Sequence, residues 1–271
     1  MEMNQPRTDI PSVLVLAGLD STGGAGIQAD VEAIASQGAH ACPVVTALTV
    51  QDTTNVMEVQ PVDAALITQQ ARAVLEDVPV AAVKIGMLGS AEVVEVVHSL
   101  LRDYPDLPVV LDPVLAAGGG RELASDDLID ALSSLLLPQV TVLTPNTPEI
   151  RRLVPEADSI RAAAMALQER GVEFVLATGT HDNTEAVVNR LFGGNRLLED
   201  YRWPRLAGEY HGSGCTLASA VAGLLAQGHE PLTAIEQAQT YAWGTLKNAF
   251  RAGMGQLLPN RFFWAMSEES R

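Results

Sequence analysis

Residues 12–37, SVLVLAGLDSTGGAGIQADVEAIASQ, decide the fold of this chain. The apolar run Ser12–Gly18 predicts a buried strand, and Ala25–Gln37 predicts a helix that ends at Gly38. The glycine-rich turn between them, Gly18–Asp30, contains neither a G-x-G-x-x-G fingerprint nor a Gly-Lys-Ser/Thr phosphate loop. Ligands of open α/β sheets bind beyond the carboxyl ends of the strands, so this turn is a candidate ligand loop, with a tight structural connection as the alternative.

The same alternation of strand and helix continues along the chain and predicts a mostly parallel sheet with helices on both faces. Gly193-Gly194-Asn195 predicts an antiparallel hairpin at the far edge of the sheet. We expect a single domain over residues 1–271, with residues 1–11 as a flexible tail. The other expected strands are Ala41–Val50, Val80–Leu88, Pro108–Val114, Val140–Asn146 and Val172–Gly179, and the other expected helices are Asp63–Glu76, Ala91–Arg102, Asp126–Leu136, Pro148–Leu153, Ile160–Arg170, Gly214–Gln227 and Leu232–Phe250.

Composition supports a layered α/β core and limits the partners. The chain is 47% hydrophobic but only 4% aromatic, so its core must be built from Ala, Val, Leu and Ile. Seventeen basic against thirty-three acidic residues give a net charge of −16, which disfavours nucleic acid and anionic membranes as partners. Anions must therefore be held locally, by backbone N–H groups, a few Lys or Arg side chains, or a divalent cation.

The two cysteines, Cys42 and Cys215, lie far apart and show no metal-ligand spacing, which predicts neither a disulfide framework nor a zinc site. The N-terminal apolar run is too short for a signal peptide, and no later segment has transmembrane length. We therefore expect a reduced, cytoplasmic protein.

Oxygen-bearing side chains follow two of the expected strands. Asp112 ends one strand and could bind Mg²⁺ directly or through water, with a helix cap or turn residue as the alternative. In TPNTPE (144–149), Asn146 and Glu149 lie three residues apart on one incipient helix turn. They offer oxygen ligands to a hydrated magnesium ion, and the alternative is a capping arrangement.

The stretch HGSGCTLASA (211–220) brings a cysteine to the first turn of an apolar helix. Gly212, Ser213 and Gly214 can present free N–H groups at the helix N-terminus, which makes an anion hole. The helix dipole there is expected to lower the pKa of the Cys215 thiol, which suits a general base; a small buried hydrophobe is the alternative. All these stretches fall at strand-to-helix junctions on the same rim of the predicted sheet.

Several linked motifs resemble the bacterial hydroxymethylpyrimidine/phosphomethylpyrimidine kinases of the ribokinase superfamily, in the same order over roughly Val13–Gln256. The resemblance implies a ribokinase-like three-layer fold and a homodimer. It also implies ATP-dependent phosphorylation of 4-amino-5-hydroxymethyl-2-methylpyrimidine, and then of its monophosphate, in thiamine biosynthesis. The motifs are AGLDSTGGAGIQADVEAIASQGAHACPVVTALTVQDT, KIGMLGS, VVLDPVL, TPNTPE and HGSGCTLASAVAGLLAQG.

The resemblance also implies roles for individual residues. Cys215 would accept the hydroxymethyl proton as that oxygen attacks the γ-phosphorus, beside the anion hole formed by Gly212, Ser213 and Gly214. A carboxylate and a carboxamide can pair with an aminopyrimidine, which fits a substrate-binding role for two such side chains. The implied substrate-binding residues are Gly18, Ala25, Asp30, Gln51 and Met87; the implied magnesium and phosphate region is Asp112, Asn146 and Glu149, with Thr178, Gly179 and His211 on the nucleotide side.

Departures from the family pattern leave alternatives open. Thr178 stands where many relatives carry a lysine, so a cationic contact to the ATP phosphates is missing and a hydrogen bond from Thr178 would replace it. Lys84, at the end of a strand, is interpreted as structural. A pyridoxal kinase of the same superfamily and a catalytically idle ligand-binding relative remain alternatives. A cysteine hydrolase that uses Cys215 with His211 is disfavoured, because four residues across a glycine turn give a thiol–imidazole pair poor geometry.

Overall fold

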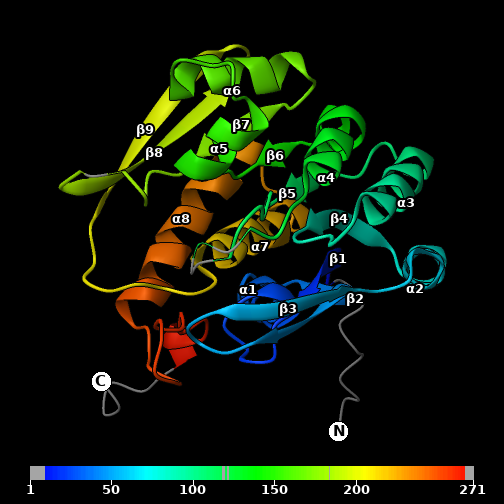
Figure 1. The fold of residues 1–271 in the computed structure, drawn as a ribbon, viewed down its shortest axis with the longest axis horizontal. Coiled ribbons are helices and arrows are strands. Elements are labelled where there is room, and N and C mark those ends of the chain that lie inside the picture. Colours follow the sequence, from blue (N-terminus) through cyan, green and yellow to red (C-terminus); the bar gives the residue numbers. More distant parts are fainter. Residues whose placement is uncertain (1–9, 118–119, 121, 183, 266–271) are drawn as a thin grey trace, which may run out of the picture.

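The computed structural model describes residues 10–117, 120, 122–182 and 184–265. Within them a nine-stranded sheet has the order β3-β2-β1-β4-β5-β6-β7-β8-β9 (Figure 1). The six strands β2, β1, β4, β5, β6 and β7 run parallel, and β3, β8 and β9 are antiparallel to their neighbours. The predicted mostly parallel sheet with an antiparallel edge hairpin is confirmed. The strands are β1 (Ser12–Leu19), β2 (His40–Gln51), β3 (Val56–Pro61), β4 (Val80–Ile85), β5 (Val109–Leu111), β6 (Val142–Leu143), β7 (Phe174–Ala177), β8 (Ala186–Gly193) and β9 (Arg196–Pro204).

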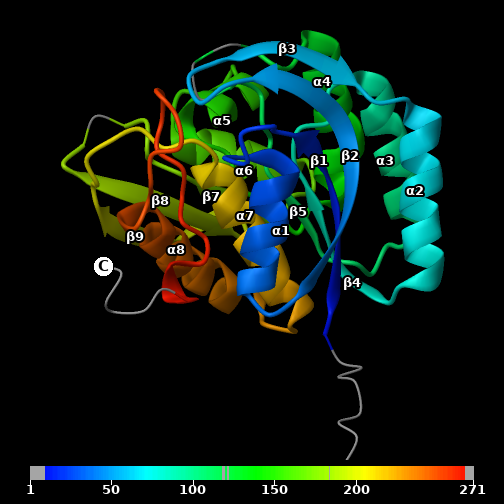
Figure 2. The same ribbon diagram turned by 90° about the horizontal axis from the view of Figure 1, so that it is seen from below.

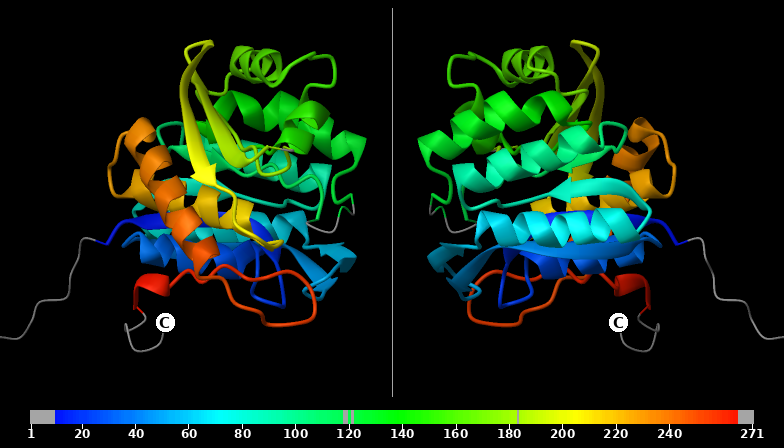
Figure 3. Two further views of the ribbon diagram at one scale, coloured as in Figure 1. Left: turned by 90° about the vertical axis from the view of Figure 1, so that its left-hand side faces the viewer. Right: turned by 90° about the vertical axis from the view of Figure 1, so that its right-hand side faces the viewer.

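Helices cover both faces of the sheet and enclose two buried apolar clusters. One face carries α1 (Gly26–Ser36), α7 (Ser213–Ala226) and α8 (Pro231–Lys247). The opposite face carries α2 (Ala64–Asp77), α3 (Ala91–Asp103), α4 (Asp126–Ala131), α5 (Thr147–Leu153) and α6 (Ile160–Glu169). In Figure 2, α1, α7 and α8 lie on one side of the strands and α2 and α3 on the other, and Figure 3 shows the molecule from two opposite sides.

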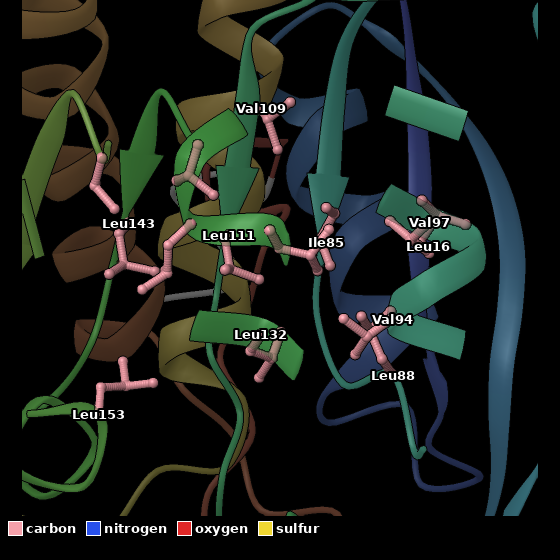
Figure 4. Close-up of a cluster of buried hydrophobic side chains, with 14 of the residues drawn as sticks. Leu16, Ile85, Leu88, Val94, Val97, Val109, Leu111, Leu132, Leu143 and Leu153 are labelled. Carbon is pink, nitrogen blue, oxygen red and sulfur yellow. The ribbon is translucent and has the colours of Figure 1, made fainter. Parts of the chain in front are cut away.

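The central strands are apolar on both sides because both of their faces are covered. β1 is buried along nearly its whole length. On the α3 side, Leu16, Ile85 and Leu111 of three adjacent strands pack with Val94 and Val97 (Figure 4). The aliphatic composition noted above therefore forms two layers of core, one on each face.

Three details differ from the sequence-based expectations. β3 was not predicted, because its residues are mostly exposed and give no clear alternation. Strand β5 ends at Leu111 and β6 at Leu143. Each strand therefore ends earlier than expected, just before a polar residue. Helix α4 ends early and continues as a π-helical turn, Leu132–Leu136. The expected N-terminal tail falls mainly on residues 1–9, which lie outside the described residues, as do residues 118–119 of the glycine run.

Among the described residues, no helix is long and apolar enough to span a membrane.

A fully buried ion pair joins the sheet to two helices on one of its faces. The Nζ atom of Lys84 on β4 lies 2.7 Å from Oδ1 of Asp30 on α1, and both side chains are 0% exposed. The hydroxyl of Ser219 on α7 donates to the same Asp30 oxygen at 2.6 Å. Burial lowers the pKa of Lys84, but the negative groups around it, Asp30 first and Asp112 among them, together outweigh burial and hold the pKa above its usual value. Lys84 therefore stays protonated, and its contact with Asp30 fixes β4, α1 and α7 relative to one another.

Replacing Lys84 by methionine is expected to lower the free energy of unfolding by about 3–5 kcal/mol, because Asp30 is left as an uncompensated buried charge. Urea unfolding measures the loss. The matched control is Arg72→Met, whose exposed pair with Asp103 is worth less than about 1 kcal/mol. The double variant Lys84→Met/Asp30→Leu should regain most of the loss; a single variant as stable as the wild type would contradict this account.

Candidate active site

A cavity of about 550 Å³ opens where the parallel strands end. The loop between β1 and α1 borders it on one side, and the turn before α7 borders it on another. The structure therefore gathers most of the sequence-predicted site residues into one place. Those that line the cavity are Gly18, Ala25, Gln51, Met87, Asp112, Asn146, Glu149, Thr178, His211, Gly212, Ser213, Gly214 and Cys215; Asp30 and Gly179 do not.

The turn before α7 requires glycine at its first residue. Gly212 is the N-cap of α7 with φ = 79°, in the left-handed region, and a Cβ there would lie 1.9 Å from the carbonyl oxygen of Gly24. The close approach packs this turn against the glycine-rich loop. The first-turn N–H groups of a helix have no intrahelical acceptor, so those at Ser213 and Gly214 are available to an anion in the cavity.

Cys215 borders the cavity between two polar partners. Its thiol lies beside the Asp112 carboxylate and the backbone N–H of Gly26, and both act on its ionisation. Burial raises the pKa of the thiol well above its ordinary value, and the Asp112 carboxylate raises it further, against the lowering effect of Lys84. The predicted lowering of this pKa is wrong for the free protein, because burial and a neighbouring carboxylate outweigh the helix dipole.

Asp112 and Glu149 are two buried carboxyl groups that disfavour each other's charge. Asp112 follows β5 and is 4% exposed, and Glu149 lies in α5 and is 8% exposed. Burial and then the Asp112 charge raise the pKa of Glu149 to about 8. Burial likewise raises the pKa of Asp112, against the opposing effect of Lys84. A cation bound beside this pair would favour the charged form of both carboxyl groups.

The Asn146–Glu149 capping box, named above as an alternative to metal binding, is present. The N–H of Glu149 donates to Oδ1 of Asn146 at 2.9 Å, and the N–H of Asn146 donates to Oε2 of Glu149 at 2.9 Å. The cap fixes the Glu149 side chain on the cavity wall, where the backbone of Leu115 also favours the charged form of the carboxyl group.

The oxygen donors in the cavity suit a magnesium ion that also binds water and phosphate, rather than a metal ion enclosed by protein side chains. No group of three or more His, Cys, Asp or Glu side chains among the described residues could enclose a metal ion. Mg²⁺ is usually held by one or two carboxylates together with water and substrate phosphates. Asp112 and Glu149 supply two such carboxylates; burial raises both pKa values, and the Asp112 charge raises that of Glu149 further, so a cation there would favour their charged forms.

The expected substrate residues divide into two groups. Met87 lies directly over Gly18, where a Cβ would come within 2.4 Å of the Met87 methyl group, and Gln51 donates to Thr49 at 2.6 Å. Asp30, by contrast, is fully buried in its ion pair with Lys84 and does not reach the cavity. The expected contact between Asp30 and an aminopyrimidine is therefore replaced by a structural role, since the sequence could not show which partner Asp30 would meet.

The expected nucleotide side lies where β6 and β7 end. The N–H of Thr178 donates to Pro145 at 2.9 Å, which sets Thr178 beside Asn146. Gly179 turns away from the cavity, and its N–H donates to the side chain of Asn189 at 3.1 Å. One lysine and one arginine side chain border the cavity among the described residues: Lys84, which lies under its floor, and Arg205.

Arg205 organises the loop that follows Thr178. Its guanidinium donates to the carbonyl groups of Thr180, Asp182 and Thr184 at 2.8–2.9 Å. The loop is therefore fixed by a side chain from the segment after β9. Arg205 was not predicted as a site residue, because its partners are backbone carbonyl groups and these leave no pattern in the sequence.

Two further features of the cavity were not predicted. Asp20 accepts from Nε2 of His211 at 2.8 Å and from the N–H groups of Thr22 and Ala25, which joins the glycine-rich loop to the turn before α7. Burial opposes ionisation of Asp20, but the hydrogen bond from His211 and those from Thr22 lower its pKa below the ordinary value. The Asp-Ser-Thr-Gly-Gly sequence is a turn signal that could have identified this aspartate.

An aromatic pair forms the second unpredicted feature. Trp203 and Trp243 stack with ring centroids 6.2 Å apart, and both line the cavity. The indole N–H of Trp243 donates to Pro204 at 3.1 Å. The two tryptophans lie 40 residues apart in sequence, on β9 and α8, so no local pattern pairs them.

Known proteins are similar in sequence to most of this chain. Residues 20–260 match the family model described as phosphomethylpyrimidine kinase. A hydroxymethylpyrimidine/phosphomethylpyrimidine kinase of Haemophilus influenzae is 36% identical over 96% of this chain and 99% of its own. A thiamine biosynthesis bifunctional protein of Geobacter sulfurreducens is 39% identical over 90% of this chain, which spans about half (51%) of that longer protein.

Solved structures give the same result. A pyridoxal kinase of Bacillus subtilis, in an ADP complex, superposes with a TM-score of 0.88 at 28% identity and covers 96% of this chain and 100% of its own. A phosphomethylpyrimidine kinase of Clostridium difficile superposes with a TM-score of 0.75 at 33% identity over 86% of this chain and 98% of its own. The ribokinase-like fold expected from the motifs is confirmed. With the family model covering most of its length, this chain belongs to the phosphomethylpyrimidine kinase family and is a phosphotransferase.

Proposed function

We propose that the cavity transfers the γ-phosphoryl group of ATP to 4-amino-5-hydroxymethyl-2-methylpyrimidine and then phosphorylates the resulting monophosphate, in thiamine biosynthesis. The observation that supports this best is the position of Cys215. Its thiol lies at the N-terminal turn of α7, next to Asp112, where the pocket around Met87 and Gln51 meets the Asn146 side of the cavity. An acceptor hydroxyl from one side and a phosphoryl group from the other would meet at this point.

Positioning and charge neutralisation account for most of phosphoryl-transfer catalysis. The N–H groups of Ser213 and Gly214 face the cavity at the positive end of α7 and suit the transferring phosphoryl oxygens. Gln51 would donate to or accept from a ring nitrogen or amine of the pyrimidine, while Met87, Gly18 and Ala25 enclose the ring.

Cys215 would act as the base that receives the hydroxymethyl proton. Its thiol is protonated in the free protein, so the base form requires relief of the negative charge at Asp112. Mg²⁺ held by Asp112 and Glu149 would supply that positive charge and offset the charge of the donor phosphates. Lys84, directly under the cavity floor, contributes in the same direction.

ATP would bind on the side of Asn146 and Thr178, whereas His211 is held against the glycine-rich loop by Asp20. Thr178 offers a hydroxyl in place of the lysine of many relatives, and Arg205 fixes the loop that follows. The Trp203–Trp243 pair provides an apolar wall suited to a nucleobase. A cytoplasmic location fits a nucleotide-dependent enzyme with free cysteines.

We also propose a homodimer formed along the β2–β3 edge of the sheet. Leu48, Val50 and Met57 are exposed there by 48%, 54% and 52%. Exposed apolar residues on adjacent strands are an energetic cost that a second copy would remove. Light scattering after size-exclusion chromatography would give the mass.

The proposed reaction predicts the products of a small substrate panel. The purified protein with Mg-ATP should convert hydroxymethylpyrimidine to the monophosphate and then the diphosphate, as identified by mass spectrometry. Pyridoxal is the essential comparison, because a pyridoxal kinase is among the similar structures. Phosphorylation of pyridoxal alone would contradict the pyrimidine assignment, and no product with any acceptor would favour a protein that binds ligands without turnover.

Replacing Cys215 by alanine is expected to lower kcat about 100-fold or more, the usual contribution of a positioned general base. Cys215→Ser should retain an intermediate rate that rises with pH between 6 and 9, because a hydroxyl is a weaker acid than a thiol. Cys42→Ala is the control, since Cys42 is buried in β2 away from the cavity. A Cys215→Ser rate equal to the wild type at every pH would remove the base role.

The raised pKa of Glu149 predicts a pH-dependent stability in the absence of Mg²⁺. Between the unfolded value of about 4.5 and the folded value of about 8, folding takes up a proton. The contribution of Glu149 to the free energy of unfolding should therefore be greatest below pH 4.5. It should fall by up to about 1.4 kcal/mol per pH unit until the pH passes 8. Urea unfolding from pH 5 to 9 tests this, and Glu149→Gln should flatten the slope. An unchanged slope in that variant would contradict the assignment.

A further inference from the structure

The segment after α8 returns beneath the active site. It passes under α1, as the red end of the ribbon shows in Figure 3. The N–H of Gln256 donates to Thr53 at 2.8 Å, and Leu257 pairs with Tyr210. The segment thus touches the β2–β3 turn and the approach to the anion hole before it reaches Arg261.

Arg261 is held in place at its backbone and buried at its side chain. Its carbonyl oxygen accepts from the hydroxyls of Ser36 on α1 and Tyr241 on α8, at 2.8 and 2.9 Å. The side chain is 2% exposed and points between the two loops of the active site. It does not line the cavity, so any effect on the reaction must pass through other residues.

The guanidinium joins both loops at once. Nε donates to the hydroxyl of Thr216 at 2.9 Å, one Nη atom donates to the carbonyl of Gly23 at 3.2 Å, and the other donates to the carbonyl of Gly24. Glu32 accepts from the first Nη atom at 3.2 Å and balances the charge. A planar guanidinium fixes the angles between such partners, which an ammonium group would not do.

Two of these contacts lead to Gly212 on the cavity wall. The Thr216 hydroxyl donates a hydrogen bond to the carbonyl of Gly212 at 2.8 Å, so the Arg261 contact also orients the peptide that begins the anion hole. The Gly24 carbonyl is the group that packs against Gly212. Arg261 therefore sets the distance between the substrate loop and the anion hole.

We propose that Arg261 is a positioning residue for phosphoryl transfer, which holds the loop Gly23–Gly26 and the turn Gly212–Thr216 in the relative placement that brings the acceptor hydroxyl to the phosphoryl group. This proposal rests on the proposed function for its effect on rate. Its effect on the two loops does not depend on the substrate.

Arg261→Met keeps the apolar length of the side chain and removes the donors. Because a displacement of about 1 Å in a reacting geometry can cost about 100-fold, kcat should fall 10- to 100-fold while KM for the acceptor changes less than about threefold. Arg261→Lys keeps the charge but not the planar set of donors, and its kcat should lie between those of the wild type and Arg261→Met. The control is Arg170→Met, which also loses contacts to a backbone carbonyl and a carboxylate but lies outside the cavity.

Hydrogen exchange provides the second measurement and needs no substrate. In Arg261→Met, the amides of Gly23, Ala25 and Thr216 should exchange about tenfold faster, while those of the central strands keep their protection at a temperature well below unfolding. Thr216→Val should speed exchange in the turn but leave the Gly23 loop protected. Arg170→Met should affect neither.

Three outcomes would overturn the proposal: kcat for Arg261→Met within twofold of the wild type, unchanged exchange in the two loops, or faster exchange across the whole chain, which would indicate loss of global stability alone. A wild-type protein that phosphorylates nothing in the panel would contradict the proposed function. The exchange measurement would still decide whether Arg261 holds the loops.

Discussion

The Lys84–Asp30 pair is the constraint on which the site depends. Neither charge can be buried without the other, so the pair fixes β4 against α1, and Ser219 brings α7 to the same oxygen. Helices α1 and α7 begin at the two turns that border the cavity. The ion pair thus sets their separation from below, while the Gly24–Gly212 contact sets it from the cavity side.

Negative charge around the cavity must be balanced locally before a phosphate could bind there. Asp112 and Glu149 would repel phosphate if both were ionised without a counter-charge, and the net charge of −16 adds to the repulsion. The first-turn N–H groups of α7 are one local source of positive potential, and the Lys84 ammonium, although paired with Asp30, favours the charged form of Asp112. These groups converge at the cavity and favour anion binding there.

Sequence patterns predicted what depends on neighbours in the chain. The apolar runs located the parallel strands, and the turns Gly18–Asp30 and His211–Cys215 were assigned to the same rim of the sheet, where both now border the cavity. The pKa of Cys215 was predicted with the wrong sign, because the helix dipole is visible in the sequence whereas the burial of the sulfur and the approach of Asp112 are not.

What the sequence could not reveal are the partners across the fold. Asp30 has a carboxylate suited to an aminopyrimidine, and only its contact with Lys84 shows that the carboxylate is already committed. Arg261 lies more than 230 residues from the glycines that it holds, and it reads as an ordinary arginine near the chain end. In this fold the residues that would perform the chemistry lie in recognisable turns, but the residues that align those turns are set by distant hydrogen bonds. A variant can therefore keep every motif and still lose the alignment on which transfer depends.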